Sequence, residues 1–234
     1  MAESMKILEL RDVVLRALSG LSLAISDVSL IIRAGESCVI SVKDREHGIG
    51  NPLFDLAQGV TEPDEGLISF MGRDWRDMTP TDQSKMRGRI GRVFETQGWI
   101  SNLSVRENIR LSQRHHTQRS EDEIAKEVEH LCSLAGLDDE LEKRPEYAAR
   151  GELQKSQWVR AFLGSPVLVL LEHPEVGVPP ESVERLICMT GEAIHRGAAV
   201  VWMTSEQTVL SSKRFAGSQR LSLSDGKLVS ARED

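Results

Sequence analysis

Cysteines are scarce in this chain of 234 residues, and long apolar runs are missing. The three cysteines, Cys38, Cys132 and Cys188, form no close pair, which argues against a disulfide framework and against a zinc cluster. No apolar run approaches the roughly 20 residues that a membrane-spanning helix needs, and residues 1–12 lack the charged-then-apolar layout of a signal peptide. We therefore expect a soluble, cytoplasmic protein that reaches a membrane only through a partner.

An excess of positive charge is also missing. Lysine and arginine number 29 against 36 aspartates and glutamates, which gives a formal net charge of −7 at pH 7. This balance argues against a general nucleic-acid surface. Hydrophobic residues make up 40% of the chain, and this length and composition suit one α/β domain with a sizeable core. We expect a globular protein without a nucleic-acid partner.

Short apolar runs that alternate with helical patterns indicate an α/β fold. Val167–Leu171 is apolar without alternation and ends at Glu172, as in a strand buried on both faces of a parallel sheet. Open α/β sheets bind ligands at the carboxyl ends of their strands, so Glu172 stands where chemistry is expected. Other strands are expected at residues 5–11, 23–32, 38–42, 67–71, 90–94 and 198–203.

Helical patterns fill residues 104–147 and interrupt the strands. Ser104 with Glu107, and Ser120 with Glu123, have the spacing of helix capping boxes. This block is therefore expected to form an inserted helical subdomain. Further helices are expected at residues 152–163 and 181–196.

One stretch has the layout of a phosphate-binding loop, because strand, glycine-bearing loop and helix follow one another from residue 38 to 59. Five further segments follow a recognisable order: LELRDV with ISDVSLIIRAGE, LAQGVTEPDEGLISFMGRD, IGRVFETQGWISNLSVRENI, WVRAFLGSPVLVLLEHPEVGVPPESVERL and VVWMTSEQ. In this order and spacing they resemble the nucleotide-binding subunit of ABC transporters over nearly the whole chain.

The resemblance implies a P-loop NTPase-like α/β fold with an antiparallel amino-terminal sheet and an inserted helical subdomain. We expect one domain over residues 1–234, with a core of residues 1–103 and 148–234 and a subdomain of residues 104–147. The resemblance also implies a membrane permease as partner, at the inner face of the cell membrane. Family members work as dimers, so this chain is expected to pair with itself or with an active paralogous ATPase subunit.

The phosphate loop departs from the family pattern. Its Gly-Lys-Ser/Thr triplet corresponds to Gly50-Asn51-Pro52 or, in a second register, to Gly48-Ile49-Gly50. Neither register supplies the lysine that neutralises phosphate or the hydroxyl that holds Mg²⁺. Asp44 and Glu46 add negative charge where phosphates would lie. Backbone amides of this loop can still bind an anion, although an ordinary loop is the favoured interpretation.

The other ATP-site positions depart as well. The catalytic positions of the family correspond to Glu95 (Q-loop glutamine), Glu172 and His173 (Walker B aspartate and glutamate), and Ser205 (switch histidine). The signature motif corresponds to Ala148–Glu152, in which Ala149 replaces the serine, Gly151 is kept and Glu152 replaces the glutamine. Pro179 stands at the D-loop aspartate, and Ala17 at the aromatic that stacks on adenine.

These departures predict a pseudo-ATPase with no catalytic residues, no cofactor and no metal. One alternative is an active ATPase in which Arg45 or Arg150 replaces the lysine and Glu172 takes the metal, with ATP and Mg²⁺ as cofactors. Another is a free-standing interaction protein without a permease. Glu172 with His173 can also be viewed as a relocated acid/base pair or half of a metal site, and the neighbouring pair His115-His116 as a chelator, but structural roles are favoured.

A partner interface is expected at Glu95, Gln97 and Trp99, because the matching Q-loop region of the family packs against the permease. Burial of Trp99 between subdomains is an equal alternative. The segments FETQGWISNLSVRENIRL and EHPEVGVPP are similar to those of Mla- and Mce-type lipid-transporter ATPases, which suggests a lipid as the transported molecule.

Overall fold

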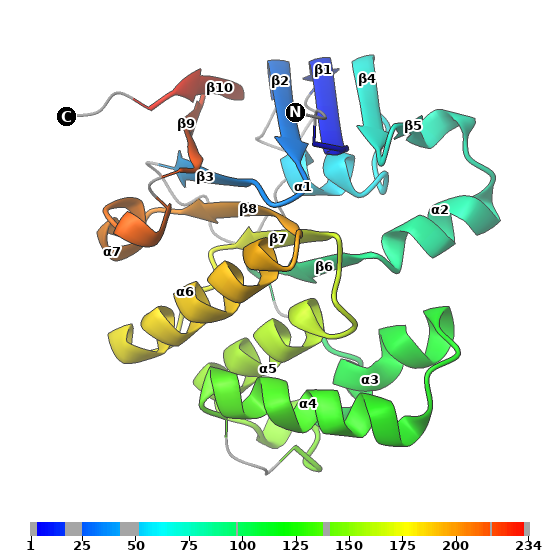
Figure 1. Ribbon diagram of the computed structural model, residues 1–234, viewed down its shortest axis with the longest axis vertical. Helices are drawn as coiled ribbons and strands as arrows, with labels where there is room; N and C mark the ends of the chain where they lie inside the picture. Colours follow the sequence, from blue (N-terminus) through cyan, green and yellow to red (C-terminus); the bar gives the residue numbers. More distant parts are fainter. Residues whose placement is uncertain are drawn as a thin grey trace.

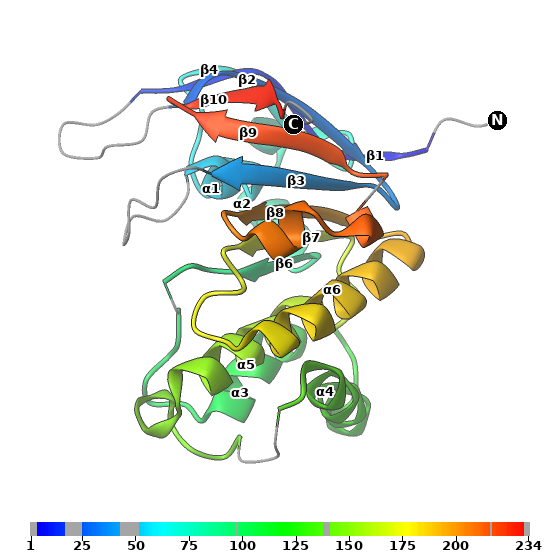
Figure 2. The same cartoon turned by 90° about the vertical axis from the view of Figure 1, so that its left-hand side faces the viewer.

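Two β-sheets and a group of helices form successive layers in the computed structural model of the protein (Figures 1 and 2). The structure describes residues 4–16, 25–42, 52–96, 98–137, 141–215 and 217–231. An antiparallel sheet lies on one side, a mainly parallel sheet lies in the middle, and the longest helices lie on the far side. The α/β fold expected from the sequence is confirmed.

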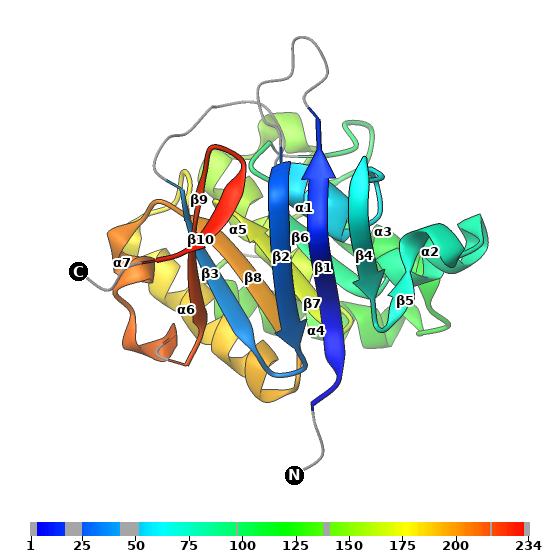
Figure 3. The ribbon, with the colours of Figure 1, turned by 90° about the horizontal axis from the view of Figure 1, so that it is seen from above.

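The antiparallel sheet is formed largely by the first part of the chain, and we call it sheet A. Its strands have the order β2-β1-β4-β5, and the first three lie side by side in Figure 3. Long strands β1 and β2 pair with bulges, while β4 continues the sheet on the other side of β1. The strand bounds are β1 Lys6–Leu15, β2 Ile25–Arg33, β4 Glu65–Phe70 and β5 Arg73–Asp74.

The second sheet, sheet B, has the strand order β10-β9-β3-β8-β7-β6. All of its pairings are parallel except that of β9 with β10. Every residue of β7 and β8 is buried, which agrees with the unbroken apolar run seen in the sequence. The strand bounds are β3 Ser37–Val42, β6 Ile90–Val93, β7 Leu168–Glu172, β8 Ala199–Thr204, β9 Gln219–Ser224 and β10 Lys227–Ser230.

Helices cover sheet B on the side away from sheet A (Figure 2). Both predicted capping boxes are formed, at the starts of α3 and α4, and α3 and α4 pack on α5. An inserted helical subdomain is thus present, while its boundaries at residues 104 and 147 remain a prediction. The helix bounds are α1 Pro52–Ala57, α2 Pro80–Arg87, α3 Val105–His116, α4 Glu121–Ala135, α5 Arg150–Phe162, α6 Pro180–His195 and α7 Gln207–Leu210, with 3₁₀ turns at Trp75–Asp77, Pro145–Tyr147 and Lys213–Phe215.

Two apolar clusters lie on the two faces of sheet B. One joins sheet A, α1 and sheet B, and it includes Phe54 and Phe70. The other joins sheet B to the helices, and it includes Trp158, Phe162 and Trp202. Because both faces of sheet B are covered, the carboxyl edge of its parallel strands is where polar side chains from several strands meet. None of the helices in the described part of the chain has the length and apolar character needed to cross a bilayer.

Candidate functional site

The carboxyl ends of β6, β7 and β8 bring several predicted positions to one edge of sheet B. Glu172 is the last residue of β7 and His173 follows it. Ser205 follows β8, which pairs in parallel with β7 through Glu172 and Met203. Glu95 lies two residues beyond β6, which pairs with the other side of β7. Parallel pairing therefore places these four positions on a common edge.

A buried arginine lies at this edge and contacts the Glu172 carboxylate. The Arg92 side chain, which is only 3% exposed, comes from β6 and places Nη2 3.2 Å from Oε2 of Glu172. Its Nη1 donates to Oδ1 of Asp55 at 2.6 Å and to Oε1 of Gln58 at 2.9 Å. One guanidinium thus joins α1, β6 and the end of β7, and it balances carboxylates from two of these elements.

Arg92 is not among the site residues predicted from the sequence. Its signal was a charged residue inside a four-residue strand, Ile90–Val93, whose last three residues are buried. A buried arginine requires an acidic or carbonyl partner. That requirement would have indicated a nearby carboxylate but not which one.

The His173 side chain is buried beside Glu175, and its Nδ1 makes no hydrogen bond with any described residue. Its backbone has a φ of +43°, and its side chain is 6% exposed with Nδ1 3.8 Å from Oε1 of Glu175. Glu175 is buried as well, and it accepts hydrogen bonds from Oγ1 of Thr204 at 2.6 Å and from Nε1 of Trp202 at 3.3 Å. This contact ties the loop after β7 to β8. Glu172 and His173 therefore face separate partners, Arg92 and Glu175.

The start of α5 carries its own carboxylate. Oε2 of Glu152 accepts a hydrogen bond from the Ala149 N–H at 2.9 Å and lies 2.8 Å from Nζ of Lys143. The Lys143 hydrogen bond, followed by that of the Ala149 N–H, lowers the pKa of the Glu152 carboxyl. Gly151 faces the carbonyl of Gly177, so the predicted signature region packs against the loop that follows β7. A negative side chain at a helix amino terminus is stabilising.

The predicted partner interface lies beyond the end of β6. Trp99 is half-buried and packs against the helical apolar cluster, with the Arg160 guanidinium 4.5 Å from its ring centroid. Arg160 Nη1 also donates to the carbonyl of Gly98 at 2.8 Å. Glu95 is half-buried, and Gln97 lies outside the described residues. The half-buried indole is compatible both with an interface and with packing between subdomains.

The predicted phosphate loop falls in a stretch that the structure does not describe. Gly48, Gly50 and Asn51 lie outside the described residues, as do Ala17 and Arg45. The description resumes at Pro52, the first residue of α1. The anion-binding and adenine-stacking predictions for this region therefore stay predictions.

The side chains at the end of β7 do not suit the Mg²⁺ ion that the resemblance implies. The Glu172 carboxylate is paired with Arg92, and a divalent cation placed beside a guanidinium would be repelled. Freeing the carboxylate would require breaking a buried ion pair, which is costly. Among the described residues, no three His, Cys, Asp or Glu side chains lie where they would hold a metal ion. We derive no step through a metal at this edge.

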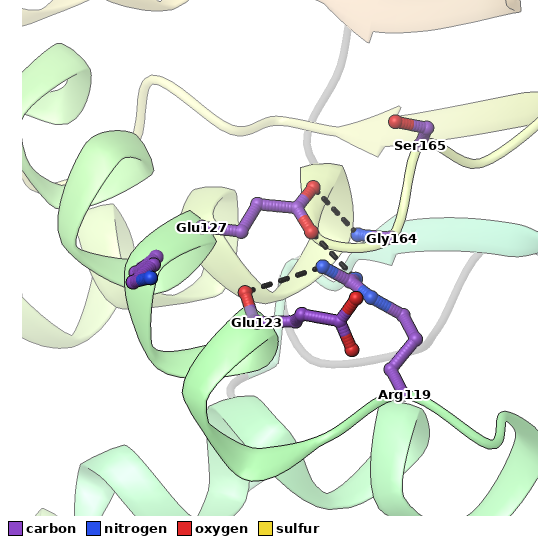
Figure 4. Close-up of a pocket in the computed structure, with 6 residues that line it drawn as sticks. Arg119, Glu123, Glu127, Gly164 and Ser165 are labelled. Carbon is purple, nitrogen blue, oxygen red and sulfur yellow. Dashed lines mark hydrogen bonds and ion pairs between the residues drawn. The ribbon is translucent and has the colours of Figure 1, made fainter.

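Two surface hollows lie away from this edge. One of about 600 Å³ lies between α4 and the turn before β7, and Figure 4 shows Arg119 paired there with Glu127. There Glu127 accepts the Gly164 N–H at 3.0 Å and contacts Arg119 at 2.6 Å. The other hollow has a volume of about 520 Å³ and is lined in part by His115 and His116. Their two imidazole rings lie edge to face, with centroids 4.7 Å apart. Burial, followed by the charge of His115, lowers the pKa of His116.

Comparison with known proteins agrees with the fold. The sequence pattern of the family described as ABC transporter matches residues 48–176. The glutamate transport ATP-binding protein GluA of Corynebacterium efficiens is 24% identical over 211 residues, 88% of this chain and 83% of that protein. The spermidine/putrescine import ATP-binding protein PotA of Nitratidesulfovibrio vulgaris is 29% identical over 175 residues, 74% of this chain and 45% of that protein.

A solved structure shows the same fold. The dimeric ATP-binding cassette MJ0796, bound to ADP and Pi after hydrolysis, superposes with a TM-score of 0.83 at 20% identity. The match covers 95% of this chain and 96% of that one. The family pattern covers more than half of the sequence, and it includes α1, the helical subdomain and the end of β7. This chain is therefore a member of the ABC transporter family.

Proposed function

We propose that this chain is an ATP-binding-type subunit that no longer hydrolyses ATP and serves as a structural or regulatory partner of a membrane permease. The observation that carries the proposal is the ion cluster of Arg92 with Glu172 and Asp55. In hydrolysing relatives the carboxylate at the position of Glu172 orients the Mg²⁺ shell, as the resemblance implies. Here a protein cation engages that carboxylate.

The residue after Glu172 supports the same proposal. Hydrolysis in the family needs a carboxylate there to polarise the attacking water. His173 replaces it, and its imidazole lies against buried Glu175, which already holds Thr204 and Trp202. A general base must reach the proton that it removes. The side chain of His173 is only 6% exposed, so little of it is open to an attacking water.

The start of α5 adds an electrostatic argument. Helix amino termini bind phosphates through free N–H groups and a favourable dipole. Glu152 engages the Ala149 N–H, and its negative charge repels a phosphate approaching from the same direction. The replacements at β7 and at α5 therefore both disfavour nucleotide. They affect the two halves of the composite site that a family dimer forms, whether this chain pairs with itself or with an active paralogue.

The surface around Trp99 supports a permease as partner. Ile100 is 44% exposed beside the half-buried Trp99, so apolar area is available next to a cation, Arg160. Aromatic and arginine side chains are enriched at protein interfaces. We propose that this surface, with Glu95 and Gln97, contacts the permease. The protein would then lie at the inner face of the cell membrane.

A lipid is our proposal for the transported molecule, and it rests on the similarity of short segments to Mla- and Mce-type ATPases. The names of the two relatives described above refer to other transported molecules, glutamate in one and spermidine or putrescine in the other. Lipid that copurifies with the intact complex, extracted and analysed by mass spectrometry, tests the proposal. An amino acid or polyamine found there in place of lipid would contradict it.

Nucleotide binding tests the proposed loss of hydrolysis. Purified protein is mixed with labelled ATP and Mg²⁺, and bound label and released phosphate are measured. We expect neither. Saturable binding at sub-millimolar ATP, or hydrolysis that is lost in a Glu172→Gln variant, would establish the active-ATPase alternative. Isolation of the tagged chain from membranes without any permease would instead favour a free-standing interaction protein.

A further inference from the structure

Arginine and aromatic side chains alternate in a stack that leads from the end of β7 to Trp99. Arg92, paired with Glu172, has its guanidinium carbon 4.4 Å from the ring centroid of Phe94. Arg160 lies 6.0 Å from the Phe94 centroid and 4.5 Å from that of Trp99. The order Glu172, Arg92, Phe94, Arg160, Trp99 is therefore continuous, with a contact at each step. We call these five side chains the arginine stack.

Both arginines of the stack are fixed by additional contacts. Arg92 donates to Asp55 and Gln58 as well as contacting Glu172. Arg160 donates from Nη1 to the carbonyl of Gly98 at 2.8 Å. Burial lowers the pKa of Arg160 to about 10, so the side chain still carries its charge at neutral pH. A desolvated cation over an aromatic ring is attracted more strongly than an exposed one, so burial strengthens the stack.

The backbone next to the stack is held as well. The Phe94 N–H donates to Oε1 of Gln157 at 3.1 Å, and Nε2 of Gln157 donates to the Phe94 carbonyl at 3.3 Å. The Ile100 N–H donates to Oδ1 of Asn108 at 2.8 Å, at the start of α3. Helices α5 and α3 therefore hold the backbone at Phe94 and at Ile100, and Arg160 holds the carbonyl of Gly98 between them.

We propose that the arginine stack is a fixed strut, which holds Gly98–Ile100 in one position relative to the ends of β6 and β7 without any nucleotide. The ion cluster at Glu172 anchors one end of the strut, and the exposed surface of Trp99 and Ile100 lies at the other end. A partner that docks on this surface then meets a preformed shape, which lowers the cost of ordering it on binding. Only the identity of that partner as a permease rests on the proposed function.

Trp99 fluorescence reports on the strut directly. Trp75, Trp158 and Trp202 are buried, and subtracting the signal of a Trp99→Phe variant isolates the Trp99 emission. We expect Arg92→Met and Phe94→Leu each to make Trp99 more accessible to acrylamide quenching, because each removes a cation–aromatic contact at Phe94. Phe94→Leu leaves the ion cluster intact, so it remains informative if Arg92→Met folds poorly.

Arg73→Met is the control, because Arg73 pairs with Asp82 at the surface and is not part of the arginine stack. It should leave Trp99 quenching unchanged. Hydrogen exchange of the Ile100 amide should accelerate roughly fivefold or more in Phe94→Leu, as expected when a contact worth about 1 kcal/mol is lost from a locally opening segment.

Unchanged quenching and exchange at Trp99 and Ile100 in both folded variants would overturn the proposal and leave Arg92 with a purely local role. No ATP is present in these measurements. Their outcome is therefore independent of the nucleotide-binding test of the proposed function.

Discussion

Arg92 carries a charge where the surrounding strand is apolar, so its partners determine its energetic effect. Burying a charge is costly, and pairing repays the cost only when the geometry is good and further hydrogen bonds are made. Arg92 has carboxylates on two sides, an amide oxygen and the Phe94 ring. Removing this side chain would leave Glu172 buried beside one fewer positive group.

Replacing Arg92 by methionine should therefore destabilise the fold strongly. We expect Arg92→Met to lower the free energy of unfolding by about 3–5 kcal/mol, the usual effect of removing one partner of a buried ion pair. Urea denaturation followed by circular dichroism measures it. Arg73→Met is the control, since Arg73 pairs with Asp82 at the surface and should cost at most about 1 kcal/mol. Equal losses in the two variants would contradict the assigned role of Arg92.

Glu152 should make stability depend on pH. Because Lys143 and the Ala149 N–H lower its pKa below the ordinary value of 4.5, the unfolded chain binds more protons than the folded one in acid. Its contribution is therefore fully present above about pH 4.5 and is lost as the pH falls through the lowered folded value. Glu152→Gln should cost about 0.5 kcal/mol at pH 7, a surface value for a helix amino terminus.

Urea denaturation of Glu152→Gln at pH 7 and near pH 3 measures this effect. The variant should approach the parent in stability at the lower pH. Glu129→Gln, an exposed substitution in the middle of α4, is the control and should show little change at either pH. A loss for Glu152→Gln that is the same at both pH values would rule out the charge as its cause.

At the scale of elements, segments with a clear apolar pattern are predictable and segments without one are not. The unbroken apolar run Val167–Leu171 predicts β7 to within one residue at each end. The capping box of Ser120 and Glu123 predicts the start of α4. Helix α2 was missed because it has no buried residue and hence no apolar face to detect. Only Thr79 before Pro80 marked its start, as a capping residue followed by proline.

For the candidate site, the positions at the sheet edge were predictable from the sequence, but the contact that joins Arg92 to Glu172 was not. Strand ends and the family resemblance placed Glu95, Glu172, His173 and Ser205 at one edge. The pairing of Arg92 with Glu172 joins side chains 80 positions apart in the sequence. Only the three-dimensional packing of β6 beside β7 creates that contact. The ion cluster, which carries our functional proposal, therefore lay beyond the reach of local patterns.

Close packing of β6 against α5 gives a sharp test at this scale. A Cβ atom added at Gly91 would overlap the carbonyl oxygen of Ala161, whereas one added at Gly191, exposed in α6, meets nothing within 4 Å. Gly91→Ala should therefore cost about 3 kcal/mol or more through overpacking. Gly191→Ala should stabilise the protein by about 0.5–1 kcal/mol, because alanine is the better helix former. Thermal unfolding of both variants measures this, and a mild effect at Gly91 would mean that β6 and α5 are farther apart.

At the scale of the whole molecule, the fold and the chemistry of the family are separable. The two apolar clusters on either side of sheet B hold the same arrangement as the ATP-binding cassette MJ0796, at 20% identity. We propose that the fold is kept for its surfaces, while buried Arg92 and the carboxylate of Glu152 supply charge where Mg²⁺ and ATP would otherwise bring it.

The most direct test of this claim is the melting temperature of the purified chain with and without Mg²⁺ and ATP. A ligand at about 100 times its Kd would stabilise the folded state by about 2.7 kcal/mol, which for a chain of this size raises the melting temperature by roughly 5–10 °C. We expect no change at millimolar ATP, while a hydrolysing member of the family measured alongside should show the rise. A rise of several degrees in this chain, dependent on both ATP and Mg²⁺, would contradict the account.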